Sequence, residues 1–207
     1  MVAPSDVVTR RPPRWAGRVP TFTGSEFSPI TPKAEDVDLL DIARGLACKY
    51  RYGGHSDPLI TVAEHSVLVV RIIDTLWPES GQQLAGLLHD ACEAYTQDIQ
   101  SPVRQFIKVQ LPSGEMITWG DMERRVNTAV AKALGISQDF YSAPEVAAAD
   151  MLAVSIEKAA CPNFRPGKWG VPAIPAELKS MRLEFLPPAE AQQLFLDTYQ
   201  RLTSSVP

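Results

Sequence analysis

Apolar residues recur at helical spacing through most of this chain of 207 residues, and patterns typical of β-strands are nearly absent. Such spacing gives each helix one apolar face, so the core must form where helices pack against one another. Capping residues, and the prolines or glycines that stop helices, set the expected boundaries. The helices expected in this way cover approximately residues 36–49, 61–77, 82–95, 121–134, 144–160 and 189–202. The predicted fold class is therefore all-α.

The helix expected at residues 61–77 carries clear signals at both ends. Thr61 and Glu64 have the spacing of a capping box, in which each side chain accepts a hydrogen bond from the other residue's backbone N–H. Pro78 follows the expected last residue and cannot continue the helix. These signals place His65 one turn inside this helix.

The first 35 residues differ in composition from the rest of the chain. They contain six prolines and a cluster of four arginines, and they lack a periodic apolar pattern. Proline removes backbone donors and keeps its neighbours out of the helical region. We therefore expect an extended arm at residues 1–35, disordered or draped over the domain, and one helical domain at residues 36–207.

Composition limits the class of partner. Hydrophobic residues make up 45% of the chain, which is enough to bury a full core, and 20 basic against 24 acidic residues give a net charge of −4. This charge argues against a basic stripe for nucleic acid, so no nucleic-acid partner is expected. We also expect no membrane association and a cytoplasmic location, because long apolar runs and a signal peptide are absent and the cysteines are few and widely spaced. The three thiols, expected to be buried, are Cys48, Cys92 and Cys161.

Metal-competent side chains interrupt three of the apolar helices. They are His65, the dipeptide His89-Asp90, and Asp150, whose neighbours are small or apolar. Burying an aspartate without a partner is costly, so each carboxylate needs a cation. Two imidazoles and two carboxylates suit a divalent transition ion such as Mn, Fe, Co, Ni or Zn. Taken singly, His65 could instead be a hydrogen-bonded core histidine and Asp150 a cap or ion-pair residue, but their occurrence together favours a metal site.

The order of these residues resembles the H…HD…D signature of the HD-domain metal-dependent phosphohydrolases. The closer resemblance is to the branch that contains the bacterial 5′-deoxynucleotidases and the phage triphosphohydrolases acting on dATP. The most specific segment is 88–103, where the family pattern HDxxE, followed by a D-[IL]-x-x-P-[VL] turn, is present as HDACE and DIQSPV. The similarity covers approximately residues 36–160, and it implies a helical bundle of the HD-domain type.

The resemblance also implies roles for individual residues. The expected metal ligands are His65, His89, Asp90 and Asp150. Glu93 matches the carboxylate that orients or deprotonates the attacking water, and Asp98 matches an acid that contacts the sugar hydroxyl or assists proton transfer. Arg51 matches an arginine for the substrate phosphate, and Tyr52 stands where relatives have an aromatic residue, often tryptophan, against the base or sugar. His55, in the glycine-containing loop that follows, either contacts a phosphate or is a surface histidine.

These residue types fit the hydrolysis of a phosphate ester, in which a divalent ion acidifies water and neutralises developing charge while a carboxylate accepts a proton. The expected activity is metal-dependent hydrolysis of nucleotides, as a 5′-deoxynucleotidase acting on deoxynucleoside monophosphates. Two alternatives stay open: a triphosphohydrolase that releases triphosphate from dNTPs, and a degenerate HD module that binds nucleotide or metal without turnover. Hydrolases of (p)ppGpp have a Glu-Asp pair shortly after His-Asp, whereas Ala94 follows Glu93 here. We expect a small-molecule nucleotide as partner, and a homo-oligomer.

Overall fold

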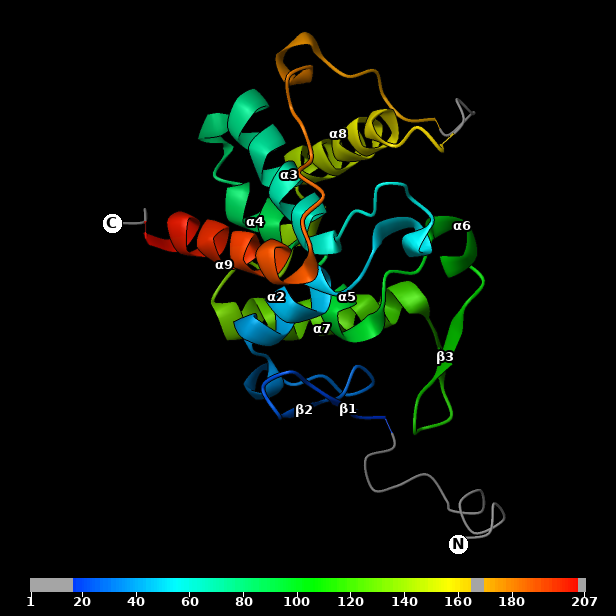
Figure 1. The fold of residues 1–207 in the computed structure, drawn as a ribbon. Coiled ribbons are helices and arrows are strands. Elements are labelled where there is room, and N and C mark those ends of the chain that lie inside the picture. Colours follow the sequence, from blue (N-terminus) through cyan, green and yellow to red (C-terminus); the bar gives the residue numbers. More distant parts are fainter. Residues whose placement is uncertain (1–16, 165–169, 205–207) are drawn as a thin grey trace, which may run out of the picture.

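The computed structural model describes residues 17–164 and 170–204. Most of these residues are helical, in agreement with the expected all-α class (Figure 1). The α-helices are α2 (Leu39–Ala47), α3 (Val62–Leu76), α4 (Gln83–Leu88), α5 (Glu93–Thr96), α6 (Ser101–Arg104), α7 (Trp119–Leu134), α8 (Pro144–Ala160) and α9 (Pro188–Ser204). Short 3-10 helices are η1 (Ala34–Asp36), η2 (Arg51–Gly54), η3 (Pro78–Ser80), η4 (Phe140–Ser142) and η5 (Ala176–Leu178).

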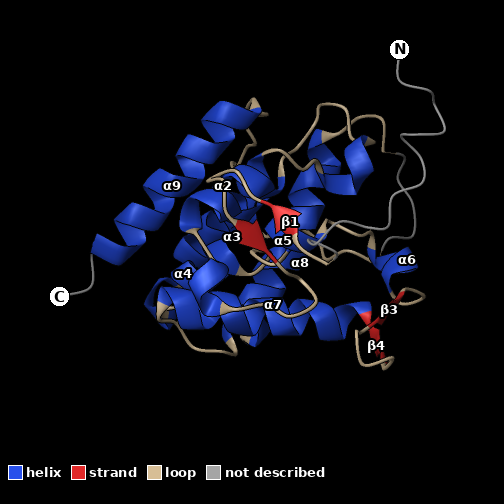
Figure 2. Ribbon diagram, turned by 90° about the horizontal axis from the view of Figure 1, so that it is seen from below, coloured by secondary structure: helices blue, strands red, loops and turns tan. Residues whose placement is uncertain are grey.

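Two small antiparallel hairpins accompany the helices (Figure 2). Strands β1 (Val19–Pro20) and β2 (Glu26–Phe27) form the first, and β3 (Lys108–Gln110) and β4 (Met116–Thr118) form the second. The second hairpin joins α6 to α7 and projects from the body of the molecule (Figure 1). Neither hairpin extends into a larger sheet within the described residues, so the core is built from helices.

Helix α3 is the centre of the bundle. It packs against α2, α4, α8 and α9, and nearly all of its residues from Val62 to Ile73 are buried. A helix that is apolar on all sides is stable only when it is covered on all sides, which explains this central position. The polar side chains of α3 are consequently held in fixed surroundings, and His65 is one of them.

Several helix ends follow the local sequence closely. Helix α8 begins at Pro144 and ends at Ala160 as expected, and α7 ends before Gly135, which adopts a left-handed conformation with φ of 68°. Helix α7 begins two residues earlier than expected, at Trp119, because Thr118 and Asp121 form a reciprocal capping box there.

The capping box expected at the start of α3 is only half present. Thr61 Oγ1 accepts the expected hydrogen bond from the Glu64 backbone N–H at 3.1 Å. The Glu64 carboxylate does not reach back to Thr61. It accepts the backbone N–H groups of the segment 184–186, at 2.6, 2.7 and 3.3 Å. The prediction of a reciprocal bond was therefore wrong, because a tertiary partner takes the place of the local one.

The single helix expected at residues 82–95 is broken. Helix α4 ends at Leu88 and α5 begins at Glu93, and the residues between them form tight turns in which Ala91 N–H donates to Leu88 O and Glu93 N–H to Asp90 O. The two halves pack on different helices, α4 on α3 and α5 on α2. The prediction of a continuous helix was wrong because the change of packing partner redirects the chain at the His-Asp dipeptide.

The described part of the N-terminal arm lies against the helical domain. Phe27 is fully buried, and its ring stacks on Tyr95 with a centroid separation of 3.8 Å. The Thr23 hydroxyl donates to Asp41 on α2 at 2.9 Å. Residues 1–16, with three of the four clustered arginines, lie outside the described residues.

Cys92 and Cys161 are buried as expected, but Cys48 is exposed because it follows α2 at the surface, so the prediction for that residue was wrong.

Among the described helices, none combines the length and the apolar character that crossing a membrane requires.

Candidate metal centre

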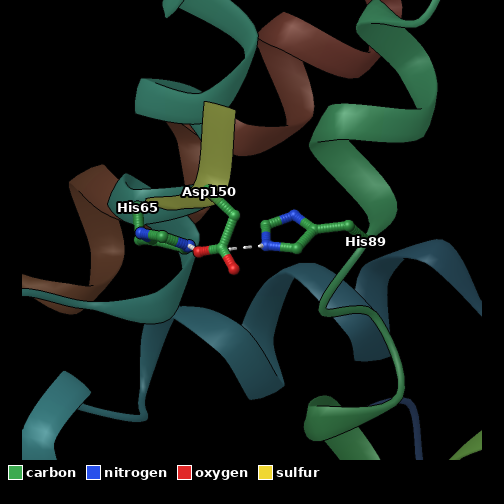
Figure 3. A group of neighbouring side chains, drawn as sticks. All are labelled: His65, His89 and Asp150. Atoms are coloured by element: carbon green, nitrogen blue, oxygen red, sulfur yellow. Dashed lines mark ion pairs between the residues drawn. The ribbon is translucent and has the colours of Figure 1, made fainter. Parts of the chain in front are cut away.

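Three helices bring His65, His89 and Asp150 to one point (Figure 3). His65 comes from the first turn of α3, His89 caps the end of α4, and Asp150 lies in the first half of α8. The Asp150 carboxylate stands between the two imidazole rings, with Oδ1 3.2 Å from His65 Nε2 and 4.0 Å from His89 Nε2. One potential ligand atom from each of the three residues lies within 4.8 Å of the others.

Asp90 joins the same cluster from the turn between α4 and α5. Its Oδ2 lies 3.2 Å from His89 Nε2 and 3.7 Å from His65 Nε2. Side chains of neighbouring residues in a regular helix diverge by about 100°, and here both His89 and Asp90 reach the cluster from the turn that follows Leu88. All four expected metal ligands are thus brought together.

The hydrogen bonds of the two rings direct their free nitrogens into the cluster. His65 Nδ1 lies 2.6 Å from Glu157 Oε1, and His89 Nδ1 lies 2.8 Å from the carbonyl oxygen of Gly86. Both partners are acceptors, so each Nδ1 carries a proton and donates it, which leaves a lone pair on each Nε2 in the neutral ring. A ligand histidine that donates its other ring N–H in this way is a recurring feature of metal sites.

Both Nε2 atoms are buried and make no hydrogen bond among the described residues, although a carboxylate oxygen lies 3.2 Å from each of them. A buried polar atom without a partner is costly, and a metal ion would satisfy both nitrogens at once. Two imidazole nitrogens with carboxylate oxygens beside them form a donor set suited to a divalent transition ion. The cluster of His65, His89 and Asp150 could therefore bind a metal, with Asp90 in position to add an oxygen.

The charges in the cluster shift the pKa values of its members in opposite directions. Burial and the positive charge of Arg51 oppose protonation of His65, but the Glu157 and Asp150 carboxylates outweigh both and raise the pKa of His65 to about 9. Burial works against ionisation of Asp150, yet the adjacent histidines hold its pKa below the ordinary value. In the absence of metal, protonated imidazole and ionised carboxylate therefore stabilise each other.

Glu93 and Asp98 interact electrostatically with Asp90 of the cluster. Burial raises the pKa of Glu93 well above its ordinary value, and the negative charges of Asp90 and Asp98 raise it further. Its Oε2 atom is buried and has no hydrogen-bond partner among the described residues. Burial also raises the pKa of Asp98, while Arg51 acts in the opposite direction. A buried carboxyl group without a hydrogen-bond partner, next to a candidate metal site, is a candidate for proton transfer.

Arg51 and Tyr52, the expected substrate residues, both contact Glu157. The Arg51 side chain is 12% exposed, with Nε 3.3 Å from Glu157 Oε2 and Nη1 3.6 Å from Asp90 Oδ2. The Tyr52 hydroxyl donates to Glu157 Oε2 at 2.5 Å, and its ring makes a T-shaped contact with that of Phe164. Arg51 therefore lies beside the cluster, whereas the polar end of Tyr52 points toward the protein interior.

His55 lies farther along the same loop, and its side chain is exposed. Its carbonyl oxygen accepts a hydrogen bond from Asn163 Nδ2 at 2.8 Å, and Asn163 Oδ1 accepts one from the Asp57 N–H at 3.0 Å. These bonds connect the backbone of the loop to Asn163, which follows α8. They do not involve the imidazole ring of His55.

Glu157 is the residue of this site that the sequence analysis did not identify. It lies on α8 seven residues after Asp150, which places both carboxylates on one side of the helix. An available signal was a second acidic residue at this spacing among the apolar residues of α8. Its importance depends on His65, which is 92 residues away in the chain.

Comparison with known proteins gives relatives of similar length. No protein-family model matches the chain. The uncharacterized protein YfdR of Escherichia coli strain K12 is 27% identical over 191 residues, which cover 89% of this chain and 95% of the relative. The uncharacterized protein RCAP_rcc00048 of Rhodobacter capsulatus is 28% identical over 196 residues, with coverage of 89% and 95%. Neither relative's name carries an activity.

Proposed function

We propose that this protein is a metal-dependent phosphohydrolase of the HD-domain type that removes the 5′-phosphate from deoxynucleoside monophosphates. The observation that carries the proposal is the pair of buried Nε2 atoms of His65 and His89, which face Asp90 and Asp150 while both Nδ1 atoms are held by acceptors. Histidines whose Nδ1 donates to an acceptor while Nε2 makes no hydrogen bond are typical of metal ligands, and are less typical of histidines buried in a core. The ligands in this proposal are the four residues that match the H…HD…D order.

A divalent ion bound by these ligands supplies Lewis acidity toward the phosphoryl oxygens. Glu93 accepts a proton from the attacking water at its carboxylate, whose Oε2 atom is buried and makes no hydrogen bond among the described residues. Asp98 contacts the sugar hydroxyl or assists in that proton transfer. Arg51 binds the phosphate through its Nη atoms, because its Nε is already held by Glu157.

The shared chemistry of this site supports phosphate-ester hydrolysis in general, and the choice of nucleotide needs a direct test. Purified protein is stripped of metal and assayed with dNMPs, NMPs and dNTPs in the presence of Mn, Co, Mg or Zn. The products are separated by chromatography. The expected result is metal-dependent release of inorganic phosphate from deoxynucleoside monophosphates.

Matched variants make this experiment decisive. Asp90→Ala removes a proposed ligand, whereas Asp139→Ala removes an exposed carboxylate near η4 and is expected to behave as the unmodified protein. Release of triphosphate from dNTPs would replace the proposed activity with that of a triphosphohydrolase. Stoichiometric metal binding without turnover of any nucleotide would overturn the enzyme assignment in favour of a binding module.

A further inference from the structure

Glu157 is a fully buried carboxylate in a helix whose neighbouring residues are largely apolar. Burying such a group is costly unless it is paired and hydrogen-bonded. Three donors compensate for the cost: His65 Nδ1, Arg51 Nε and the Tyr52 hydroxyl. One donor comes from α3 and the other two come from η2, so Glu157 joins two separate parts of the site to α8.

The two oxygens of Glu157 serve different groups. Oε1 lies 2.6 Å from His65 Nδ1, whereas Oε2 lies 3.3 Å from Arg51 Nε and accepts the Tyr52 hydroxyl at 2.5 Å. An ionised carboxylate can accept all of these bonds simultaneously, because it has about four lone-pair sites. A carboxamide at this position cannot, since only one of its two polar atoms is an acceptor.

We propose, on the basis of the proposed function, that Glu157 is a positioning residue that couples the metal ligand His65 to the phosphate-binding Arg51. Through Oε1 it fixes the ring of His65 with Nε2 facing the cluster. Through Oε2 it holds Arg51 Nε, which leaves the Nη atoms of the guanidinium for the space beside Asp90, where Nη1 lies 3.6 Å from Oδ2.

The backbone of η2 supports this interpretation. Tyr52 has a φ of 57°, in the left-handed region that residues other than glycine rarely adopt. A strained conformation of this kind persists when surrounding contacts hold it. The bond from Tyr52 to Glu157 and the edge-on contact with Phe164 are two such contacts. The loop that presents Arg51 is therefore shaped partly by the same carboxylate that orients His65.

The test compares Glu157→Gln with the unmodified protein in a titration with Zn²⁺ after removal of metal. A glutamine retains the shape of the side chain but can accept from only one of the two sides at a time. We expect the affinity for Zn²⁺ to fall by about 10- to 100-fold, as is typical when the partner of a ligand histidine is removed. Glu157→Asp, which keeps the charge on a shorter side chain, is expected to restore part of this affinity.

Glu145→Gln is the matched control. Glu145 lies in the first turn of the same helix, and the substitution is chemically identical. We expect its Zn²⁺ affinity to remain unchanged and its thermal stability to fall only slightly, because the substitution removes one negative charge from the first turn of α8. Equal Zn²⁺ affinity in Glu157→Gln and Glu145→Gln would overturn the coupling of Glu157 to His65.

The proposed contact of Glu157 with Arg51 is tested by a separate measurement. With a deoxynucleoside monophosphate at saturating metal, Glu157→Gln is expected to raise KM at least several-fold, because Arg51 loses its fixed orientation. A KM equal to that of the unmodified protein would overturn the coupling to Arg51. The Zn²⁺ titration requires no turnover, so a protein that binds metal but hydrolyses nothing would refute the proposed function without affecting the result for His65.

A measurement on the unmodified protein covers the case in which the variants fail to fold. In the Zn²⁺-loaded protein, the His65 Nδ1 proton bonded to a buried carboxylate should give a far-downfield resonance in proton NMR, protected from exchange with water. Selective ¹⁵N labelling of histidine assigns it, because only three histidines are present. Absence of this resonance would overturn the proposal.

Discussion

Asp150 and Glu157 lie two turns apart on α8 and hold opposite nitrogens of a single ring, that of His65. Asp150 Oδ1 is 3.2 Å from Nε2, and Glu157 Oε1 is 2.6 Å from Nδ1. One helix therefore places a carboxylate at each end of the imidazole, although the ring belongs to α3. This arrangement makes the orientation of a candidate ligand depend directly on the packing of α8 against α3.

Substitutions at Asp90 and Glu93 should separate metal binding from catalysis. Asp90→Ala is expected to abolish metal content and activity together, because it removes an oxygen ligand that lies 3.2 Å from His89 Nε2. Glu93→Ala should retain the metal and lose about 100-fold or more in turnover, as expected for a lost acid–base group. Metal analysis of both purified variants alongside their kinetics makes the comparison, with Asp139→Ala as control. If Glu93→Ala loses metal as completely as Asp90→Ala, Glu93 is itself a ligand.

The metal-free protein should lose stability as the pH rises above neutral. The pKa of His65 is raised to about 9 in the folded state, against an ordinary value of 6.5. Protonation of this ring therefore stabilises the fold fully below pH 6.5, and the stabilisation is lost as the pH rises toward 9. Tm measured in the presence of a chelator is expected to decrease over this range.

Metal should reverse this trend, because binding displaces the proton from His65 Nε2 and is therefore favoured at higher pH. The Tm of Mn²⁺-loaded protein is expected to exceed that of chelated protein by a margin that grows between pH 6.5 and 9. His55→Gln, which alters an exposed loop histidine, should leave both trends unchanged. A chelated protein whose Tm is constant across the range would show that His65 is not protonated in the metal-free state.

The sequence predicts the helices best where a residue next to the helix end marks the boundary. Pro144 marks the beginning of α8, and Gly135 marks the end of α7. The break at residues 89–92 has no such signal, because apolar spacing continues through it and the cause is a change of packing partner from α3 to α2. The presence of a helix can therefore be predicted from short-range sequence pattern, whereas the change of chain direction at residues 89–92 depends on tertiary contacts.

The residues of the candidate site also differ in whether the sequence alone predicts them. The four expected ligands stand out in the sequence because histidine and aspartate are unusual inside apolar helices, and the structure brings them together. Glu157 does not stand out, because a glutamate on a helix usually faces solvent. Its burial follows from the position of His65 and Arg51, both about a hundred residues earlier in the chain.

Glu64 should contribute to stability without contributing to the site, although it is adjacent to His65 in sequence. Its carboxylate accepts three backbone N–H groups from residues 184–186, where Phe185 has a φ of 57°. Glu64→Ala leaves these donors without their acceptor and is expected to lower the free energy of unfolding by about 3 kcal/mol. Chemical denaturation measures this loss.

Glu184→Ala is the control for that experiment. It removes an exposed side chain from the same contact and keeps the backbone N–H that donates to Glu64, so a change within about 0.5 kcal/mol is expected. The affinity of Glu64→Ala for Zn²⁺, measured at a temperature where the variant is folded, should equal that of the unmodified protein. A variant as stable as the unmodified protein would mean that water replaces the carboxylate in this contact.

Arg51 should determine how tightly the substrate phosphate is held. Its guanidinium is nearly buried between Glu157 and Asp90, with Nε on the first and Nη1 toward the second. Lysine retains the charge but cannot contact Glu157 and a phosphate in the same two-pronged geometry. Arg51→Lys is therefore expected to lower kcat/KM clearly, and Arg51→Ala to nearly eliminate it while metal remains bound. Steady-state kinetics on the preferred nucleotide, with Zn²⁺ titration of each variant, provides the measurement.

Arg124→Lys, at an exposed pair with Asp121 on α7, is the matched control and should behave as the unmodified protein. Near-normal kcat/KM in Arg51→Ala would mean that another basic group binds the phosphate, with His55, Arg104 and Lys108 as the next candidates; of these, Arg104 is already paired with Glu123.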